Sequence, residues 1–134
     1  AGGTLVLDSE GLSKLAAGES QVRAHLDTAR LRRARVVVSA ITLVEVLRGD
    51  PRDASVLSRI VTVPVTSELA RAAGELLGVT GLSGHRCAID SVVAATALVM
   101  PRPVVLLTSD LDDLSRLVEE PGCPKEQRVV VIHV

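Results

Sequence analysis

The stretch VVLLTSDLDDL, residues 104–114, joins a short apolar run directly to a cluster of carboxylates. Its first four residues are Val or Leu and are too few for a helix, so they predict a buried strand. Asp110 then favours the start of a helix, because Asp is a preferred N-cap residue. The same strand-to-helix junction recurs along the chain and decides the fold.

Strands and helices alternate through the rest of the sequence. The apolar patterns and the turn residues predict strands at 4–7, 36–38, 61–65, 104–107 and 129–134, and helices at 10–17, 19–33, 39–48, 53–60, 66–78, 83–99 and 110–118. Such alternation implies right-handed crossovers and a parallel sheet with helices on both faces. We therefore expect an α/β fold with a central parallel sheet of about five strands.

Composition narrows the possible functions. The 134 residues fit one domain, and no apolar run approaches the roughly 18 residues of a membrane span, although the mean hydropathy is +0.37. Phe, Tyr and Trp are absent, which excludes recognition of nucleic-acid bases by aromatic stacking. The 15 basic and 16 acidic residues nearly balance, so net charge indicates little about partners.

The cysteines and the chain start suggest a cytoplasmic protein. Cys87 and Cys123 match no metal-binding or redox spacing, and no signal peptide is recognisable. We interpret residues 1–3, which lack an initiating Met, as a cloning remnant or a disordered start.

Four carboxylates stand out by their positions. Asp8 follows the first predicted strand and Asp110 the fourth, which places both at the carboxyl edge of the sheet, where open α/β folds bind ligands. Each could equally cap the helix that follows it. Glu45 and Asp90 instead lie inside predicted helices among apolar neighbours, where an ionised carboxylate is costly unless it is paired or bound to a cation.

Ion pairs are the structural alternative to a cation. Arg48 lies three residues after Glu45, and Arg86 lies four residues before Asp90, so either could pair on its own helix. A shared cation accounts for all four acids more economically. A site made of carboxylate oxygens selects Mg²⁺ or Mn²⁺ over zinc.

The acids of residues 110–113 are not equivalent on a helix. Asp113 returns to the face of Asp110, whereas Asp112 points away from it. We expect Asp110 to be a ligand, Asp113 to be a second candidate and Asp112 to face water.

Four fragments of the chain together resemble the PIN domains, in particular the VapC-type ribonuclease toxins of bacterial toxin–antitoxin modules. These fragments are LVLDS at 5–9, TLVEVLRG at 42–49, AIDSVVAATAL at 88–98 and LTSDLDDL at 107–114. Each is weak alone, and their order and spacing over essentially the whole chain carry the resemblance. It implies a single PIN domain over 1–134, folded as a three-layer α/β/α sandwich.

The resemblance also implies a role for each acid. Asp8, Glu45, Asp90 and Asp110 match the catalytic, metal-binding quartet, Asp113 matches a fifth metal ligand, and Ser9 and Thr108 match supporting hydroxyls. One or two Mg²⁺ or Mn²⁺ ions would activate water to hydrolyse RNA, leaving a 5′-phosphate and a 3′-hydroxyl. The implied partners are RNA, an antitoxin whose segment occupies the acidic groove, and a second copy in a homodimer.

Basic residues are needed beside such a site, because the acids repel RNA. Arg48, Arg86 and the arginines of 30–35 are candidates to hold the RNA backbone, although the 30–35 cluster also fits a solvated helix end. The segment 83–87 is idiosyncratic for the family, so Arg86 and Cys87 leave open a modified pocket. We interpret His85 as a surface residue at a helix start.

Two other functions remain open from the sequence. The chain could be a catalytically degenerate PIN module that only binds a partner. It could also be an aspartyl phosphotransferase or receiver-like domain, which gathers acids at strand ends in a similar way. Such a domain needs a lysine after a late strand, and Lys14 and Lys125 are badly placed for that role.

Overall fold

The computed structural model describes residues 2–134. The elements are β1 Thr4–Leu7, α1 Ser9–Ala16, α2 Ser20–Leu31, β2 Arg35–Ser39, α3 Ala40–Val46, α4 Arg52–Leu57, β3 Val61–Val63, α5 Ser67–Thr80, α6 Gly84–Val99, β4 Val104–Thr108, α7 Leu111–Leu117, the 3-10 helix η1 Lys125–Gln127 and β5 Val130–His133. No helix within the described range is long and apolar enough to cross a membrane.

The chain start is held against the sheet. Ala1, the first of the three residues expected to be a remnant or a disordered start, lies outside the described residues. The carbonyl of Gly3 accepts a hydrogen bond from the backbone nitrogen of Arg35 at 3.0 Å. Gly3 has φ +80°, and a Cβ there would lie 2.0 Å from the carbonyl oxygen of Pro103, so only glycine fits.

The five strands form one parallel sheet in the order β3-β2-β1-β4-β5. Leu7 at the end of β1 stands beside Val38 of β2 and Leu107 of β4, so these three strands end almost level. The chain moves outward from β1 to β3 on one side and then crosses to β4 and β5 on the other. The strand order therefore reverses between β1 and β4, which is where open α/β sheets bind ligands.

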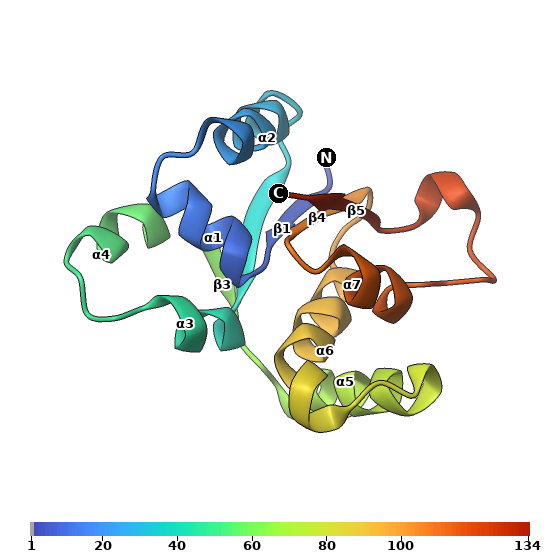
Figure 1. Ribbon diagram of the computed structural model, residues 1–134. Coiled ribbons are helices and arrows are strands. Elements are labelled where there is room, and N and C mark those ends of the chain that lie inside the picture. Colours follow the sequence, from blue (N-terminus) through green and yellow to red (C-terminus); the bar gives the residue numbers. More distant parts are fainter. Residues whose placement is uncertain (1) are drawn as a thin grey trace.

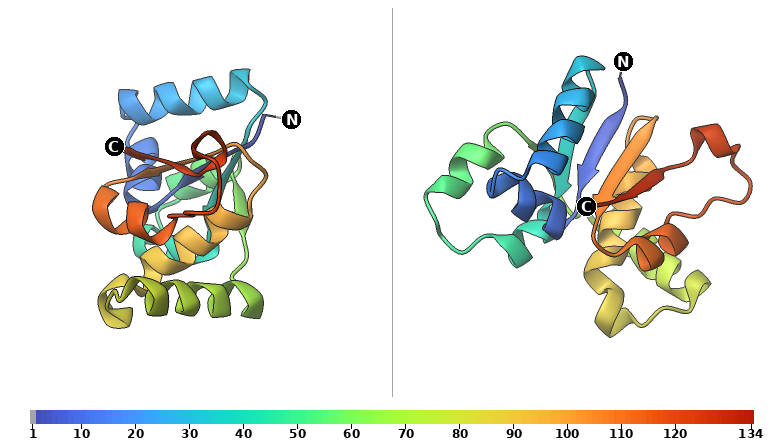
Figure 2. Two further views of the ribbon diagram at one scale, coloured as in Figure 1. Left: turned by 90° about the vertical axis from the view of Figure 1, so that its right-hand side faces the viewer. Right: turned by 45° about the horizontal axis from the view of Figure 1, so that its top comes forward.

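Alternate residues of the strands supply two cores. Leu5 and Leu7 point to the face covered by α1 and α2, whereas Val6 points to the face covered by α6 and α7. Figures 1 and 2 show the sheet between these two helical layers, with α5 lying outside α6. The predicted three-layer α/β/α sandwich with a parallel sheet of five strands is confirmed.

Four predicted helix ends differ from the structure by two residues or more, and of these α2 ends at Leu31 instead of residue 33 and α4 at Leu57 instead of residue 60. Helix α5 runs through Gly78 and ends at Thr80, because the next residue, Gly81, adopts the left-handed conformation that closes a helix, with φ 71°. Helix α3 ends at Val46 instead of Arg48, because Leu47 is already extended. Gly49 has φ +79° and belongs to the loop after Leu47.

Candidate active site

All four predicted acids line one cavity of about 280 Å³. We call it the acidic cavity; its lining residues are Asp8, Ser9, Glu45, His85, Arg86, Ala88, Ile89, Asp90, Ser109 and Asp110. Asp8 and Ser109 directly follow the ends of β1 and β4, so the cavity lies at the point where the strand order reverses. Asp110 follows Ser109, whereas Glu45 comes from α3 and Asp90 from α6.

Asp8 both caps a helix and lines the acidic cavity. Its side chain is only 5% exposed and accepts a hydrogen bond from the backbone nitrogen of Gly11 at 2.9 Å, as an N-cap residue does. Burial raises the pKa of Asp8, and hydrogen bonds from the Thr108 side chain and the Gly11 backbone oppose that rise. Capping, the alternative left open by the sequence, is thus present together with a position in the cavity.

Asp110 occupies the matching position after β4. Its Oδ1 accepts a hydrogen bond from the backbone nitrogen of Asp113 at 3.3 Å, which caps α7. The backbone nitrogen of Asp110 donates to the hydroxyl of Thr108 at 2.9 Å, and Thr108 is fully buried. The Thr108 hydroxyl therefore orients the turn that carries Asp110 into the cavity.

Asp90 is the most perturbed acid of the group. It lies half-buried in the middle of α6, and its pKa is raised to about 7. Burial is the largest cause, followed by a hydrogen bond with Asp110 and by the charges of Asp110, Asp8 and Asp113. Burial, together with the neighbouring acids, thus favours the protonated form of Asp90.

The donor set fits a hard divalent cation. Asp90, Asp110 and Asp113 each offer a carboxylate oxygen, and these oxygens lie within 4.8 Å of one another. Mg²⁺ and Mn²⁺ prefer such oxygen ligands, and a bound cation would relieve the repulsion that raises the pKa of Asp90. These acids can therefore bind a metal of the kind that the sequence predicts.

Glu45 lines the cavity from an unexpected environment. It lies in the last turn of α3 and is exposed, so the argument from a buried carboxylate on an apolar face is wrong for this residue. The possible pair with Arg48 does not form within residues 2–134. Instead, the Arg48 guanidinium donates to the carbonyls of Val44 and Leu47 at the end of α3, and Arg48 does not line the cavity.

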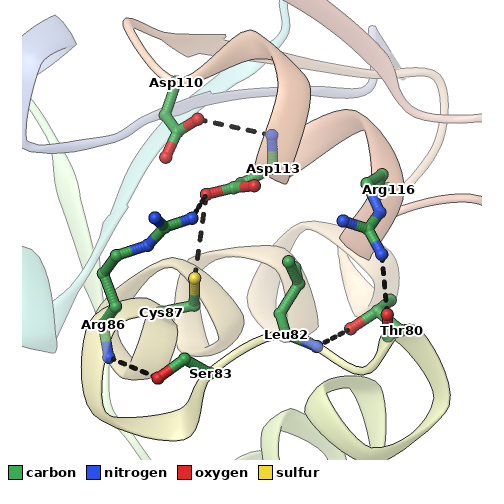
Figure 3. Close-up of polar contacts among 8 residues, drawn as sticks. All are labelled: Thr80, Leu82, Ser83, Arg86, Cys87, Asp110, Asp113 and Arg116. Atoms are coloured by element: carbon green, nitrogen blue, oxygen red, sulfur yellow. Dashed lines mark hydrogen bonds and ion pairs between the residues drawn. The ribbon is translucent and has the colours of Figure 1, made fainter.

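Arg86 pairs with a different acid from the one considered in the sequence. Its Nη2 lies 3.4 Å from Oδ2 of Asp113, whereas no pair with Asp90 forms among the described residues. The buried thiol of Cys87 donates to the same Oδ2 at 3.7 Å. Figure 3 shows Arg86 and Cys87 reaching from the start of α6 to Asp113, with Asp110 facing the same space. Asp112 is exposed, as its helical position predicts.

Sequence reasoning missed the place of His85 and the contact of Cys87. His85 is a surface residue in the first turn of α6, as expected, but it also lines the acidic cavity. A signal for this was present, since residues 85, 86, 89 and 90 share one face of a helix. No comparable signal exists for the Cys87–Asp113 contact, which joins two helices through the fold.

Comparison with known proteins gives results at the level of the fold. No protein-family model and no curated protein matches the chain. A chain of VapBC2 from Rickettsia felis, bound to a promoter DNA fragment, is similar with TM-score 0.64 and 15% identity over 98% of each chain. DNA-bound VapBC from Salmonella typhimurium is similar with TM-score 0.63 and 19% identity over 97% of each chain. A chain of FitAB bound to the IR36 DNA fragment is similar with TM-score 0.60 and 19% identity, over 96% of this protein's chain and 94% of the FitAB chain.

The chain is thus a parallel α/β sandwich with an acidic cavity at the reversal of strand order. More narrowly, it has the PIN-domain fold found in the VapBC and FitAB complexes, and the resemblance seen in the sequence motifs is confirmed at the level of the fold. The receiver-like alternative lacks its lysine at the site. Lys14 pairs with Glu10 at 3.9 Å, Lys125 lies in η1, and neither lines the acidic cavity.

Proposed function

We propose that this protein is a metal-dependent endoribonuclease, the toxin of a VapBC-type toxin–antitoxin pair. The observation that carries the proposal is the convergence of Asp8, Glu45, Asp90 and Asp110 on one cavity at the reversal of strand order. These residues come from four separate segments, and helix capping alone gives no reason for Glu45 and Asp90 to join Asp8 and Asp110 there. A degenerate binding module would have no need of this convergence.

The acids would hold one or two Mg²⁺ or Mn²⁺ ions. Asp8, Glu45, Asp90 and Asp110 are the metal ligands in this proposal, with Asp113 as the fifth acid, and the carboxylate spacing of 4.8 Å or less among Asp90, Asp110 and Asp113 supports it. A metal held by these acids would supply an activated water and would stabilise charge on the phosphate.

Supporting groups position the acids and the substrate. Thr108 holds the turn of Asp110 through its hydroxyl, and Ser9 lines the cavity beside Asp8. Arg86 and Arg48 are the proposed contacts to the RNA backbone, and of these two only Arg86 lines the cavity. Hydrolysis would leave a 5′-phosphate and a 3′-hydroxyl.

The proposed partners are a cognate antitoxin and a second copy of the chain in a cytoplasmic homodimer. Support for the antitoxin comes from the similar structures, which are two-component VapBC and FitAB complexes. A segment of the antitoxin would occupy the acidic cavity and thereby block both the metal and the RNA.

The test is cleavage of RNA by the wild type and by acid-to-amide variants. Asp8→Asn and Asp90→Asn should each lower Mg²⁺- or Mn²⁺-dependent cleavage by about 100-fold or more, and a chelator should abolish wild-type activity. Asp112→Asn removes the same charge from an exposed position outside the cavity and serves as the control. Full activity of both site variants, in preparations free of contaminating nuclease, would overturn the proposal. Calorimetry that detects no Mn²⁺ binding would favour the degenerate module instead.

A further inference from the structure

The acidic cavity has two basic residues in its lining, and they are neighbours. His85 and Arg86 lie side by side in the first turn of α6, while the four charged residues that share the lining with them are carboxylates. A polyanion that enters the cavity is repelled by those carboxylates, even after a metal has neutralised part of their charge. The start of α6 is therefore the part of the lining suited to hold a phosphate of the polyanion other than the one at the metal-binding acids.

The Arg86 side chain is held by one weak contact and is otherwise exposed. Its side chain is 75% exposed, and its single contact to Asp113 measures 3.4 Å, longer than the roughly 2.7–2.9 Å of a strong charge-assisted hydrogen bond. Only Nη2 of the guanidinium makes this contact. The remaining N–H groups are available to a ligand, and a planar guanidinium matches a phosphate with two parallel hydrogen bonds.

Asp113, the partner of Arg86 in this contact, is itself held in place. Its side chain is only 17% exposed, and Oδ2 accepts from both Arg86 and the Cys87 thiol. Because Arg86 and Cys87 are adjacent on α6, both donors hold Asp113 from the same side (Figure 3). An acid held in this way directs the arginine along the cavity rim and keeps its guanidinium near the metal-binding acids.

We propose that Arg86, assisted by His85, binds the backbone phosphate next to the scissile one, and that Asp113 is the positioning residue for Arg86. The identity of the ligand as RNA rests on the proposed function. Arg86 is thereby a substrate-contacting residue with a defined task, and Asp113 links that contact to the metal site. Other contacts to the RNA fall outside this proposal.

The experiment measures the binding of a single-stranded RNA oligonucleotide in the Asp8→Asn background, in a chelator so that no metal contributes to binding, over a series of salt concentrations. Arg86→Ala should weaken binding by about tenfold and reduce the slope of log affinity against log salt by about 0.7, the value for one phosphate contact on a single strand. Arg86→Lys should recover part of the affinity and the whole slope, because it keeps the charge and loses the paired hydrogen bonds. His85→Ala should weaken binding by about fivefold.

The control is Arg71→Ala, which removes the same charge from an exposed position on α5. Asp113→Asn should weaken binding less than Arg86→Ala and should add nothing in the Arg86→Ala background, because Asp113 acts through Arg86. Titration with Mn²⁺ in the otherwise wild-type protein should give an affinity for Arg86→Ala that is equal to or tighter than that of the wild type. This readout separates loss of a phosphate contact from damage to the metal site.

Each outcome decides the matter. If Arg86→Ala binds RNA with the same affinity and salt slope as the Arg71→Ala control, the assignment of Arg86 is wrong. If His85→Ala binds RNA with unchanged affinity, His85 does not contact the phosphate. If the losses of RNA affinity from Asp113→Asn and Arg86→Ala are additive, Asp113 does not act through Arg86. Absence of both RNA cleavage by the wild type and RNA binding by the Asp8→Asn protein would overturn the proposed function itself. This result differs from RNA binding that is normal but does not depend on Arg86, which would overturn only the present proposal.

Discussion

The Asp8 carboxylate lies 2.9 Å from the backbone nitrogen of Gly11, so the side chain that caps α1 also lines the acidic cavity. The cap uses Oδ1, and the Thr108 side chain also donates a hydrogen bond to this carboxylate. Helix capping and metal binding are usually treated as rival explanations for an acid after a strand. In this protein the capping geometry holds the carboxylate in the place where a metal site requires it.

This relationship predicts different effects for two substitutions of Asp8. Asn is as good an N-cap residue as Asp, so Asp8→Asn should change the free energy of unfolding little while it removes Mn²⁺ binding. Asp8→Ala should lose both functions and lower the free energy of unfolding by about 1 kcal/mol. Urea unfolding in a chelator, combined with calorimetric Mn²⁺ titration, measures both quantities. Equal stability of the two variants would show that the cap contributes nothing.

The raised pKa of Asp90 predicts that metal binding depends on pH. Its pKa is about 7 without metal, so a cation must displace a proton from Asp90 below that pH. We expect the Mn²⁺ affinity to rise by about tenfold per pH unit up to pH 7 and to level off above it. Asp90→Asn should bind more weakly, without this step in the profile. A flat wild-type profile from pH 5 to pH 8 would contradict the assignment.

The same shift predicts a pH-dependent stability of the metal-free protein. The pKa of Asp90 is raised from the ordinary 3.8 to about 7 in the fold, so the unfolded chain releases this proton first as pH rises. The fold therefore loses stability between about pH 4 and pH 7, and Asp90→Asn escapes that loss. In a chelator the variant should be more stable than the wild type by about 1–2 kcal/mol at pH 7, after allowance for solvent screening, and equal to it near pH 4. Thermal unfolding at the two pH values tests the sign.

Thr42 offers a separate test of packing in α3. It is fully buried, and its hydroxyl has no hydrogen-bond partner among the described residues. Thr42→Val keeps the shape and removes an unsatisfied polar group, so it should raise the free energy of unfolding by about 1 kcal/mol. Thr96 is the matched control, because it is equally buried but donates to the carbonyl of Val92 at 2.8 Å. Thr96→Val should not stabilise the protein, and equal gains in both variants would contradict the argument.

The sheet was predictable from the sequence because its strands are short apolar runs followed by turn or cap residues. Thr4–Leu7 and Val104–Thr108 are buried almost throughout, as apolar strands of a parallel sheet covered on both faces are expected to be. The helix ends were harder. Gly78 and Gly81 are both possible stops, and only the left-handed conformation of Gly81 distinguishes them.

The acids of the site were predictable for unequal reasons. Asp8 and Asp110 follow from the parallel topology, since the ends of adjacent parallel strands meet at one edge. Asp90 follows from its half-buried helical position, but the same reasoning failed for Glu45, which is exposed. The partner of Arg86 could not be predicted, because Asp113 lies on another helix and the two meet only through the packing of α6 against α7.

The acidic cavity draws its carboxylates from segments that are spread over nearly the whole chain, from Asp8 to Asp110. During synthesis the ribosome releases the residues in order, and the turn that carries Asp110 emerges after the segments that carry Asp8, Glu45 and Asp90. A growing chain therefore lacks the full set of four carboxylates until residue 110 has been released. Under the proposed function, this order of synthesis delays RNA cleavage until the last of the four acids is in place.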